Sequence, residues 1–146
     1  MNSAEYNPLK LENQLCFPLY AASKEIIRQY RPFLDQLDLT YTQYIAMMVF
    51  WENKTISVKQ LGEKLFLDSG TLSPMLKSLE QKGFVRRFRS VDDERVLLVE
   101  ITKTGEALRE RALTVPTELS RCIALSSEEA LALYTILYKI LGKITE

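Results

Sequence analysis

The sequence predicts a mainly α-helical protein with a small β-hairpin. Three observations support this fold class: apolar residues at helical spacing near both ends of the chain, two short capped helices around a glycine-containing turn, and two strand-like segments directly after them. The 146 residues suit one domain, and a hydrophobic share of 47% is enough to build a core. We therefore expect a single domain over residues 1–146.

A long amphipathic helix is expected near the N-terminus. Apolar residues recur at spacings of three and four over residues of about 10–31. Pro18 removes one backbone donor and is expected to bend this helix, and Pro32 is expected to end or break it. A second, strongly apolar helix is expected over residues 42–51.

The centre of the chain begins with a short capped helix. Ser57 and Gln60 form a predicted capping box. The serine hydroxyl accepts from the Gln60 backbone amide, and the Gln60 side chain reaches back to the Ser57 backbone amide. The helix that they start runs to about Phe66. The polar, glycine-containing segment 67–70 then predicts a turn.

A further helix follows this turn and runs to about Gln81, with Gly83 as its stop. Its start stays open between two N-caps, one at residues 68–69 and one at Ser73, which precedes a proline. Two short helices around a glycine-bearing turn are typical of a helix-turn-helix.

The pattern changes to strands after this pair of helices. Residues 84–89 and 96–101 are rich in β-formers, and the polar residues 90–95 lie between them, which predicts a β-hairpin with a charged tip. A hairpin directly after a helix-turn-helix is the order of a winged helix. We therefore predict a winged helix-turn-helix over residues of about 55–101.

Two helices are expected to close the chain. Thr102 is a predicted cap for the first of them, which is interrupted at Pro116. Ser126 and Glu129 form a second predicted capping box, and the helix that they open is expected to run to about residue 144.

This last helix has an apolar seam that needs a covering partner. Candidate partners are the N-terminal helix and the same helices of a second subunit. We therefore expect dimerisation helices over residues of about 10–31 and 117–146. The seam consists of Ala130, Tyr134, Leu137, Leu141 and Ile144.

Composition excludes several classes of function. The chain has no histidine, which removes the usual Ser-His and Cys-His catalysis, and two cysteines alone make a poor zinc site. No glycine-rich phosphate loop is present. We therefore expect no enzyme activity, no cofactor and no metal. No apolar run is long enough for a membrane span and no signal-peptide pattern begins the chain, so a cytoplasmic protein is expected.

Charge distribution points to nucleic acid although the net charge is zero. Residues 77–89 hold five basic side chains against one acidic one. Small hydroxyls at the start of the second helix suit base edges or phosphates, and an arginine at the hairpin tip suits a narrow minor groove. Asp92 or Asp93 is expected to orient that arginine. The alternative is a hairpin that only packs on the core. The predicted DNA-binding residues are Asp68, Ser69, Thr71, Ser73, Lys77, Arg86, Arg87, Arg89, Asp92 and Arg95.

Several segments resemble a known family. Residues 92–95 (Asp-Asp-Glu-Arg), followed by Leu98-x-x-Ile101-Thr102-x-x-Gly105, resemble the wing signature of the MarR family of transcription regulators. The segments 10–17, 39–44 and 67–77 resemble the organic-hydroperoxide-resistance repressor branch of that family. The similarity covers nearly the whole chain.

The resemblance implies a homodimeric repressor that binds a palindromic operator near a peroxide-detoxifying gene. It implies that Cys16 is the reactive thiol and that an organic hydroperoxide is the inducer. In this branch, tyrosines hydrogen-bond the sulfur, and the matching positions are Tyr20, Tyr30 and Tyr41. Cys122 falls where some members carry a second cysteine that traps the oxidised thiol as a disulfide across the dimer.

Spacing along the N-terminal helix bears on this sensing hypothesis. Tyr20 follows Cys16 by four residues and so neighbours it on one helix face. Tyr30 lies 14 residues from Cys16, which is roughly 21 Å along a regular helix. It therefore reaches the thiol of its own subunit only if the helix breaks, whereas an antiparallel helix of a partner subunit brings it there. We expect a sulfenic acid at Cys16 to condense with Cys122 to a disulfide. The oxidised protein is then expected to release DNA.

Three alternatives stay open. A repressor of the same family with two structural cysteines would instead bind an aromatic small molecule at the dimer cleft. A thiol peroxidase would use Cys16 catalytically. A helical dimer that only scaffolds partners leaves the charged hairpin unexplained.

Overall fold

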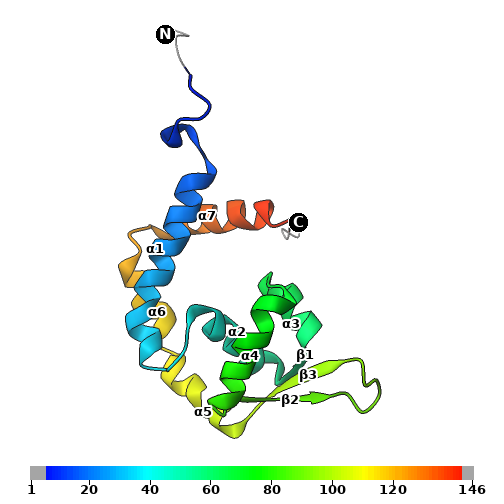
Figure 1. The fold of residues 1–146 in the computed structure, drawn as a ribbon. Helices are drawn as coiled ribbons and strands as arrows, with labels where there is room; N and C mark the ends of the chain where they lie inside the picture. Colours follow the sequence, from blue (N-terminus) through cyan, green and yellow to red (C-terminus); the bar gives the residue numbers. More distant parts are fainter. Residues whose placement is uncertain (1–5, 143–146) are drawn as a thin grey trace.

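The computed structural model describes residues 6–142, and helices dominate this part of the chain (Figure 1). Helices α1 and α6 lie side by side at one end of the molecule, and the β2–β3 hairpin projects from the other. The elements in chain order are a 3-10 turn at Leu11–Asn13, α1 (Cys16–Asp35), α2 (Tyr41–Asn53), β1 (Thr55–Ser57), α3 (Val58–Leu65), α4 (Ser69–Gln81), β2 (Val85–Arg89), β3 (Leu97–Ile101), α5 (Lys103–Ala112), α6 (Val115–Cys122) and α7 (Ser127–Ile140).

The three strands form one antiparallel sheet with β3 in the middle. Val85 pairs with Ile101 and Arg89 with Leu97, which confirms the predicted hairpin. Strand β1 was not predicted from the sequence. It has three residues, too few to show a period-two pattern, and it exists because it pairs with β3, more than 40 residues later.

The helix-turn-helix consists of α3 and α4. The Ser57 hydroxyl caps α3 by accepting from the Gln60 amide at 3.1 Å. The returning arm of the predicted capping box differs: the Gln60 side chain accepts from the Ser57 hydroxyl at 3.2 Å rather than from its backbone amide. The Asp68 carboxylate accepts from the amide of Thr71 at 2.8 Å, so α4 begins at Ser69.

This cap decides between the two starts that the sequence left open. Ser73 and Pro74 lie inside α4 rather than at its beginning. Lys82 closes the helix, and Gly83 follows with φ +81°, a left-handed conformation that favours glycine. The predicted stop is therefore confirmed.

The core lies between α2, the helix-turn-helix and the sheet. Met47 and Phe50 of α2, Leu61 of α3, Leu79 of α4 and Val99 of β3 are fully buried. Helix α2 has an apolar, mostly buried centre because it is packed by α1, α3, α4 and α5. This packing fixes α4 and the hairpin on one rigid body.

Helix α1 differs from its prediction at both ends. It begins at Cys16 instead of about residue 10, and Pro18 is its third residue, where a missing amide removes no intrahelical bond. The predicted stop at Pro32 is wrong, because the helix continues to Asp35. Pro32 lies in the last turn, where the loss of one hydrogen bond is offset by packing against α2 and α6.

The C-terminal helices follow their predicted caps. Thr102 accepts from the Gly105 amide at 3.1 Å and caps α5, and Pro116 is the second residue of α6. Ser126 and Glu129 form the full capping box of α7. Helix α7 ends at Ile140, earlier than predicted, and residues 143–146 lie outside the described part.

Apolar side chains of α7 and of the N-terminal half of α1 are exposed. No residue of α7 is buried within residues 6–142. Over the same residues, every helix is too short or too polar to cross a bilayer. The large exposed apolar residues of these segments are Leu15, Phe17, Leu19, Tyr20, Leu131, Leu133, Tyr134, Ile136 and Ile140.

Candidate nucleic-acid interface and thiol site

Helix α4 is amphipathic: its apolar face packs on the core, and its N-terminal hydroxyl residues face solvent. Its apolar residues, among them Leu72 and Leu76, are buried against the core. The predicted contact residues Ser69, Thr71, Ser73 and Lys77 are all exposed. Asp68 is engaged as the N-cap of the helix.

Two of the predicted DNA-binding arginines are held by their own chain. The Arg86 guanidinium pairs with the Glu100 carboxylate at 3.0 Å and lies 4.5 Å from the centre of the Phe88 ring. The Glu80 carboxylate accepts from the backbone amide of Arg87 at 2.8 Å and from its guanidinium at 3.3 Å.

The Glu80–Arg87 pair joins α4 to β2. The hydrogen bond from the Arg87 backbone amide is the main cause that lowers the pKa of Glu80, and the Arg87 side chain adds to it. Lys77 and Arg89, by contrast, have no ion-pair partner within residues 6–142. Of the basic residues predicted to contact DNA, Lys77 and Arg89 therefore carry charges without an ion-pair partner in the described part of the chain.

The hairpin tip carries an oriented arginine. The Arg95 guanidinium donates to both carboxylate oxygens of Asp93, at 3.0 and 3.2 Å, and its side chain is 90% exposed. The hydrogen bonds from Arg95 lower the pKa of Asp93. Of the two acids that the sequence left open, Asp93 makes the pair, while the Asp92 amide donates to the Ser90 hydroxyl.

Cys16 is a free, exposed thiol at the first residue of α1. The neighbouring Tyr20 is 61% exposed, and the Lys24 ammonium lies 5.1 Å from the centre of its ring. No hydrogen bond joins the Tyr20 hydroxyl to the sulfur in the described chain. Cys16 stands in the first turn of α1, where backbone amides have no intrahelical partner.

Three tyrosines gather at the other end of α1. The ring of Tyr30 lies 4.9 Å from that of Tyr41 and 5.7 Å from that of Tyr44. Burial, followed by the neighbouring phenols, raises the pKa of Tyr30 to about 12. Burial also raises the pKa of Tyr41 and Tyr44. These phenols therefore stay protonated at neutral pH and remain hydrogen-bond donors.

The tyrosine cluster, defined as Tyr30, Tyr41 and Tyr44, is separated from Cys16 by the unbroken helix α1. Among residues 6–142, none of its hydroxyls has a hydrogen-bond partner. Tyr44 was missed by sequence reasoning. The signal available was its spacing of three residues from Tyr41 on a predicted helix.

Cys122 is also free and exposed, at the last residue of α6. Its thiol donates to the Glu118 carbonyl at 3.5 Å, and the Glu118 carboxylate pairs with Arg121 at 3.0 Å. Within residues 6–142 no cluster of three or more potential ligands is arranged to hold a metal ion.

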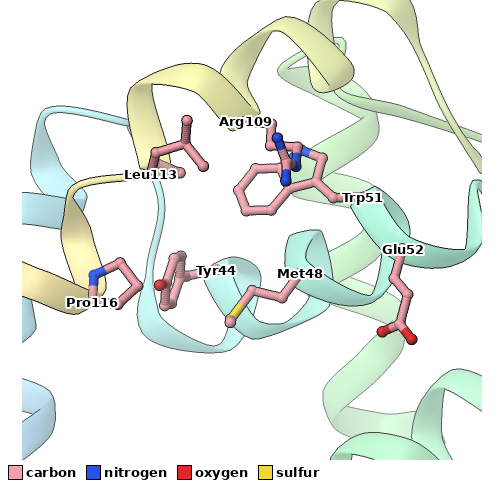
Figure 2. Close-up of a pocket in the computed structure, with 8 residues that line it drawn as sticks. Tyr44, Met48, Trp51, Glu52, Arg109, Leu113 and Pro116 are labelled. Atoms are coloured by element: carbon pink, nitrogen blue, oxygen red, sulfur yellow. The ribbon is translucent and has the colours of Figure 1, made fainter.

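An open pocket of about 390 Å³ lies between α2, the end of α5 and the start of α6 (Figure 2). Tyr44 and Met48 of α2 face Leu113 and Pro116 across it, whereas the Glu52 carboxylate points away. Trp51 closes one side, and its indole NH donates to the Gly105 carbonyl at 2.9 Å.

Residues 28–111 match the family model described as the transcriptional regulator SarA/Rot. The organic hydroperoxide resistance transcriptional regulator of Bacillus subtilis is 47% identical over 137 residues, which cover 94% of this chain and 93% of that protein.

Solved structures of AbfR of Staphylococcus epidermidis are also similar. Reduced AbfR bound to DNA has a TM-score of 0.76 and 35% identity, covering 90% of this chain and 92% of that one. Disulfide-formed AbfR has a TM-score of 0.64 and 34% identity, with the same two coverages.

Proposed function

Because the chain belongs to the MarR/SarA family of winged-helix transcriptional regulators, in its organic-hydroperoxide-resistance branch, we propose that it is a redox-sensing repressor. It binds operator DNA as a homodimer while Cys16 is reduced. An organic hydroperoxide oxidises Cys16, Cys122 resolves the oxidised sulfur, and the dimer leaves the DNA.

The exposed face of α4 supports the DNA-binding part of this proposal. A recognition helix presents its N-terminal residues to base edges, and Ser69, Thr71 and Ser73 occupy that position. Lys77 and Arg89 then contact phosphates, since their charges are unpaired. Arg95, oriented by Asp93, enters the minor groove beside the hairpin. The structure of reduced AbfR bound to DNA, a protein of similar fold, supports DNA binding by this chain.

The exposed apolar faces of α1 and α7 support the homodimer. They are too extensive for the surface of a monomer, and a second copy offers the matching faces by two-fold symmetry. In this arrangement, residues of about 10–31 and 117–146 are the dimerisation helices.

The observation that carries the sensing proposal is the separation of Cys16 from the tyrosine cluster along an unbroken α1. The unpartnered hydroxyls of Tyr30 and Tyr41 are donors without an acceptor in their own subunit. An antiparallel α1 of the partner subunit brings a thiolate to them. Tyr20 is the local donor, four residues from Cys16.

The chemistry balances with the peroxide as the only oxidant. The Cys16 thiolate attacks the O–O bond, takes one oxygen as a sulfenic acid, and releases an alcohol after proton uptake. The Cys122 thiol then attacks the sulfenic sulfur, forms the disulfide and releases water. Cellular thiols reduce the disulfide and restore the repressor.

The disulfide is the step that changes DNA affinity. It requires the two α-carbons to approach within about 7 Å. Since α1 and α6 carry the two cysteines and pack on each other, and α1 also packs on α2, their displacement moves the winged parts of the dimer.

The test is fluorescence anisotropy on DNA from upstream of the gene, before and after addition of cumene hydroperoxide. Wild type is expected to bind, release on oxidation and rebind after dithiothreitol. Cys16→Ser is expected to stay bound. Cys122→Ser is expected to form no covalent dimer on a non-reducing gel and to overoxidise. A Cys16→Ser variant that releases as wild type does would contradict the proposal.

The pocket beside Tyr44 supports a second candidate, a repressor that responds to a small molecule. Aromatic and apolar side chains line it, with Arg109 at its edge, which suits an aromatic acid. A wild-type protein that binds DNA, ignores peroxide and releases in the presence of salicylate would favour this candidate. The relatives are transcriptional regulators, and none of the described features favours a peroxidase.

A further inference from the structure

Gln43 is the one buried polar side chain in the described part of the chain, with 4% of its surface exposed. Its amide joins the start of α2 to the C-terminal end of α4. The Oε1 atom accepts from the Thr40 amide at 3.0 Å and from the Lys82 ammonium at 3.1 Å. The Nε2 atom donates to the Ser78 hydroxyl of α4 at 3.0 Å.

Lys82, the residue that closes α4, completes this network. Its ammonium also donates to the Asp38 carbonyl and lies 3.6 Å from the Asp38 carboxylate, and its side chain is 24% exposed. Asp38 lies in the turn between α1 and α2 and has a left-handed φ of 55°. We name Asp38, Gln43, Ser78 and Lys82 the α4 clamp.

The α4 clamp holds only the C-terminal end of the helix. The 13 residues of α4 span roughly 20 Å, and Ser69 and Thr71 lie at the end opposite the clamp, where Leu72 anchors the helix to the core. A pivot of about 10° at the clamp moves that end by roughly 3 Å. A displacement of this size exceeds what a hydrogen bond to a base edge tolerates.

A different orientation of α4 would leave the buried amide or the ammonium unpaired. Buried polar groups without partners are strongly unfavourable, so the network permits one arrangement of the helix and disfavours the others. An apolar contact at the same place would allow sliding. Gln43 therefore does more than cap α2: its polar side chain also restricts the orientation of α4.

We propose that Gln43 and Lys82 are positioning residues of the DNA site, which set the orientation of α4 without touching DNA. This inference rests on α4 being the recognition helix of the proposed function. It assigns to Lys82 a task different from that of Lys77, a lysine five residues earlier on the same helix that faces outward.

The test compares three methionine variants, Gln43→Met, Lys82→Met and Lys77→Met, by fluorescence anisotropy. The probes are a labelled fragment from upstream of the gene and a scrambled fragment of equal length and composition. Each affinity is measured over a series of salt concentrations. Circular dichroism and the thermal midpoint of each variant report whether the fold is retained.

Loss of the clamp is expected to lower operator affinity about tenfold, because only a fraction of the molecules keeps the competent orientation. Affinity for scrambled DNA and the salt slope stay as in wild type. Lys77→Met is expected to weaken both probes and to reduce the salt slope by about one, as the loss of a phosphate contact does.

Gln43→Glu is the rescue variant. Its two carboxylate oxygens accept from the Thr40 amide, the Lys82 ammonium and the Ser78 hydroxyl, so operator affinity is expected to return to within about twofold of wild type. Ser78→Ala removes one hydrogen bond only and is the milder variant if Gln43→Met fails to fold. It is expected to lower operator affinity in the same selective way.

Two results would overturn the inference: unchanged operator affinity in the folded clamp variants, or a Lys82→Met salt slope reduced as in Lys77→Met. The latter would make Lys82 a phosphate contact. A wild-type protein that does not prefer the operator fragment would contradict the proposed function itself, and the clamp with it. The wild-type measurement thus separates the two failures.

Discussion

Tyr30 is a residue whose ionisation reports on the packing around it. Burial and the two neighbouring phenols raise its pKa from 10.0 to about 12. A group with a raised pKa in the folded state stabilises the fold below its unfolded pKa, and this contribution is lost as the pH rises through the folded value. The tyrosine cluster therefore stabilises the fold below pH 10 and loses that effect toward pH 12.

Replacement of Tyr30 by phenylalanine is expected to reduce the loss of stability between pH 10 and pH 12, since one buried phenol no longer titrates. Urea unfolding at a series of pH values measures this. Tyr20→Phe, at an exposed site on the same helix, is the control and is expected to follow wild type. Equal losses in Tyr30→Phe and wild type would show that the phenol is not buried in solution.

At the scale of the element, α5 depends on a glycine. A Cβ at Gly105 would lie 2.2 Å from the Phe84 carbonyl oxygen and 2.8 Å from Ile101 Cγ1. The same residue accepts the Trp51 indole hydrogen bond through its carbonyl. The first turn of α5 therefore lies directly against the hairpin and α2, and this close approach holds the wing in place.

Gly105→Ala is expected to destabilise the fold by about 2–3 kcal/mol, because backbone must move to admit the methyl group. Gly70→Ala is the matched control, since its Cβ meets only the Asp68 side chain at an ordinary 3.4 Å. There the helical alanine is expected to be neutral or stabilising by about 0.5–1 kcal/mol. Chemical denaturation measures the free energy of unfolding of both variants. An unchanged free energy of unfolding in Gly105→Ala would disprove the close approach.

Among residues 6–142, helices α1 and α7 carry the largest groups of exposed large apolar residues. Ile136 in the middle of α7 is 56% exposed, and Val91 at the hairpin tip is 96% exposed. Exposure alone therefore does not mark an interface. What distinguishes α7 is a row of such residues along one helix.

Ile136→Asp is expected to shift the protein from dimer to monomer, because an unpaired carboxylate would be buried in an apolar interface. Val91→Asp adds the same charge at an exposed apolar site and is expected to leave the dimer intact. Sedimentation equilibrium distinguishes them. A dimer of unchanged affinity in Ile136→Asp would exclude α7 from the interface.

The sequence by itself determined the elements that depend on near neighbours. Residues a few positions apart set these elements, so their patterns can be recognised in the sequence. They are the caps at Thr102 and Ser126, the stop at Gly83 and the β2–β3 hairpin. The exposed hydroxyl face of α4 follows from the same periodicity. The two exposed cysteines were also located from sequence, although their redox roles remain proposals.

Tertiary structure alone decided which charged and polar groups are already engaged. Arg86 and Arg87 belong to a basic run in the sequence, yet each pairs with a glutamate brought near by folding. Strand β1 exists through its pairing with β3, and Gln43 meets Ser78 across 35 positions. These interactions join residues whose distance in the chain carries no local signal, because packing of the whole core decides which surfaces meet.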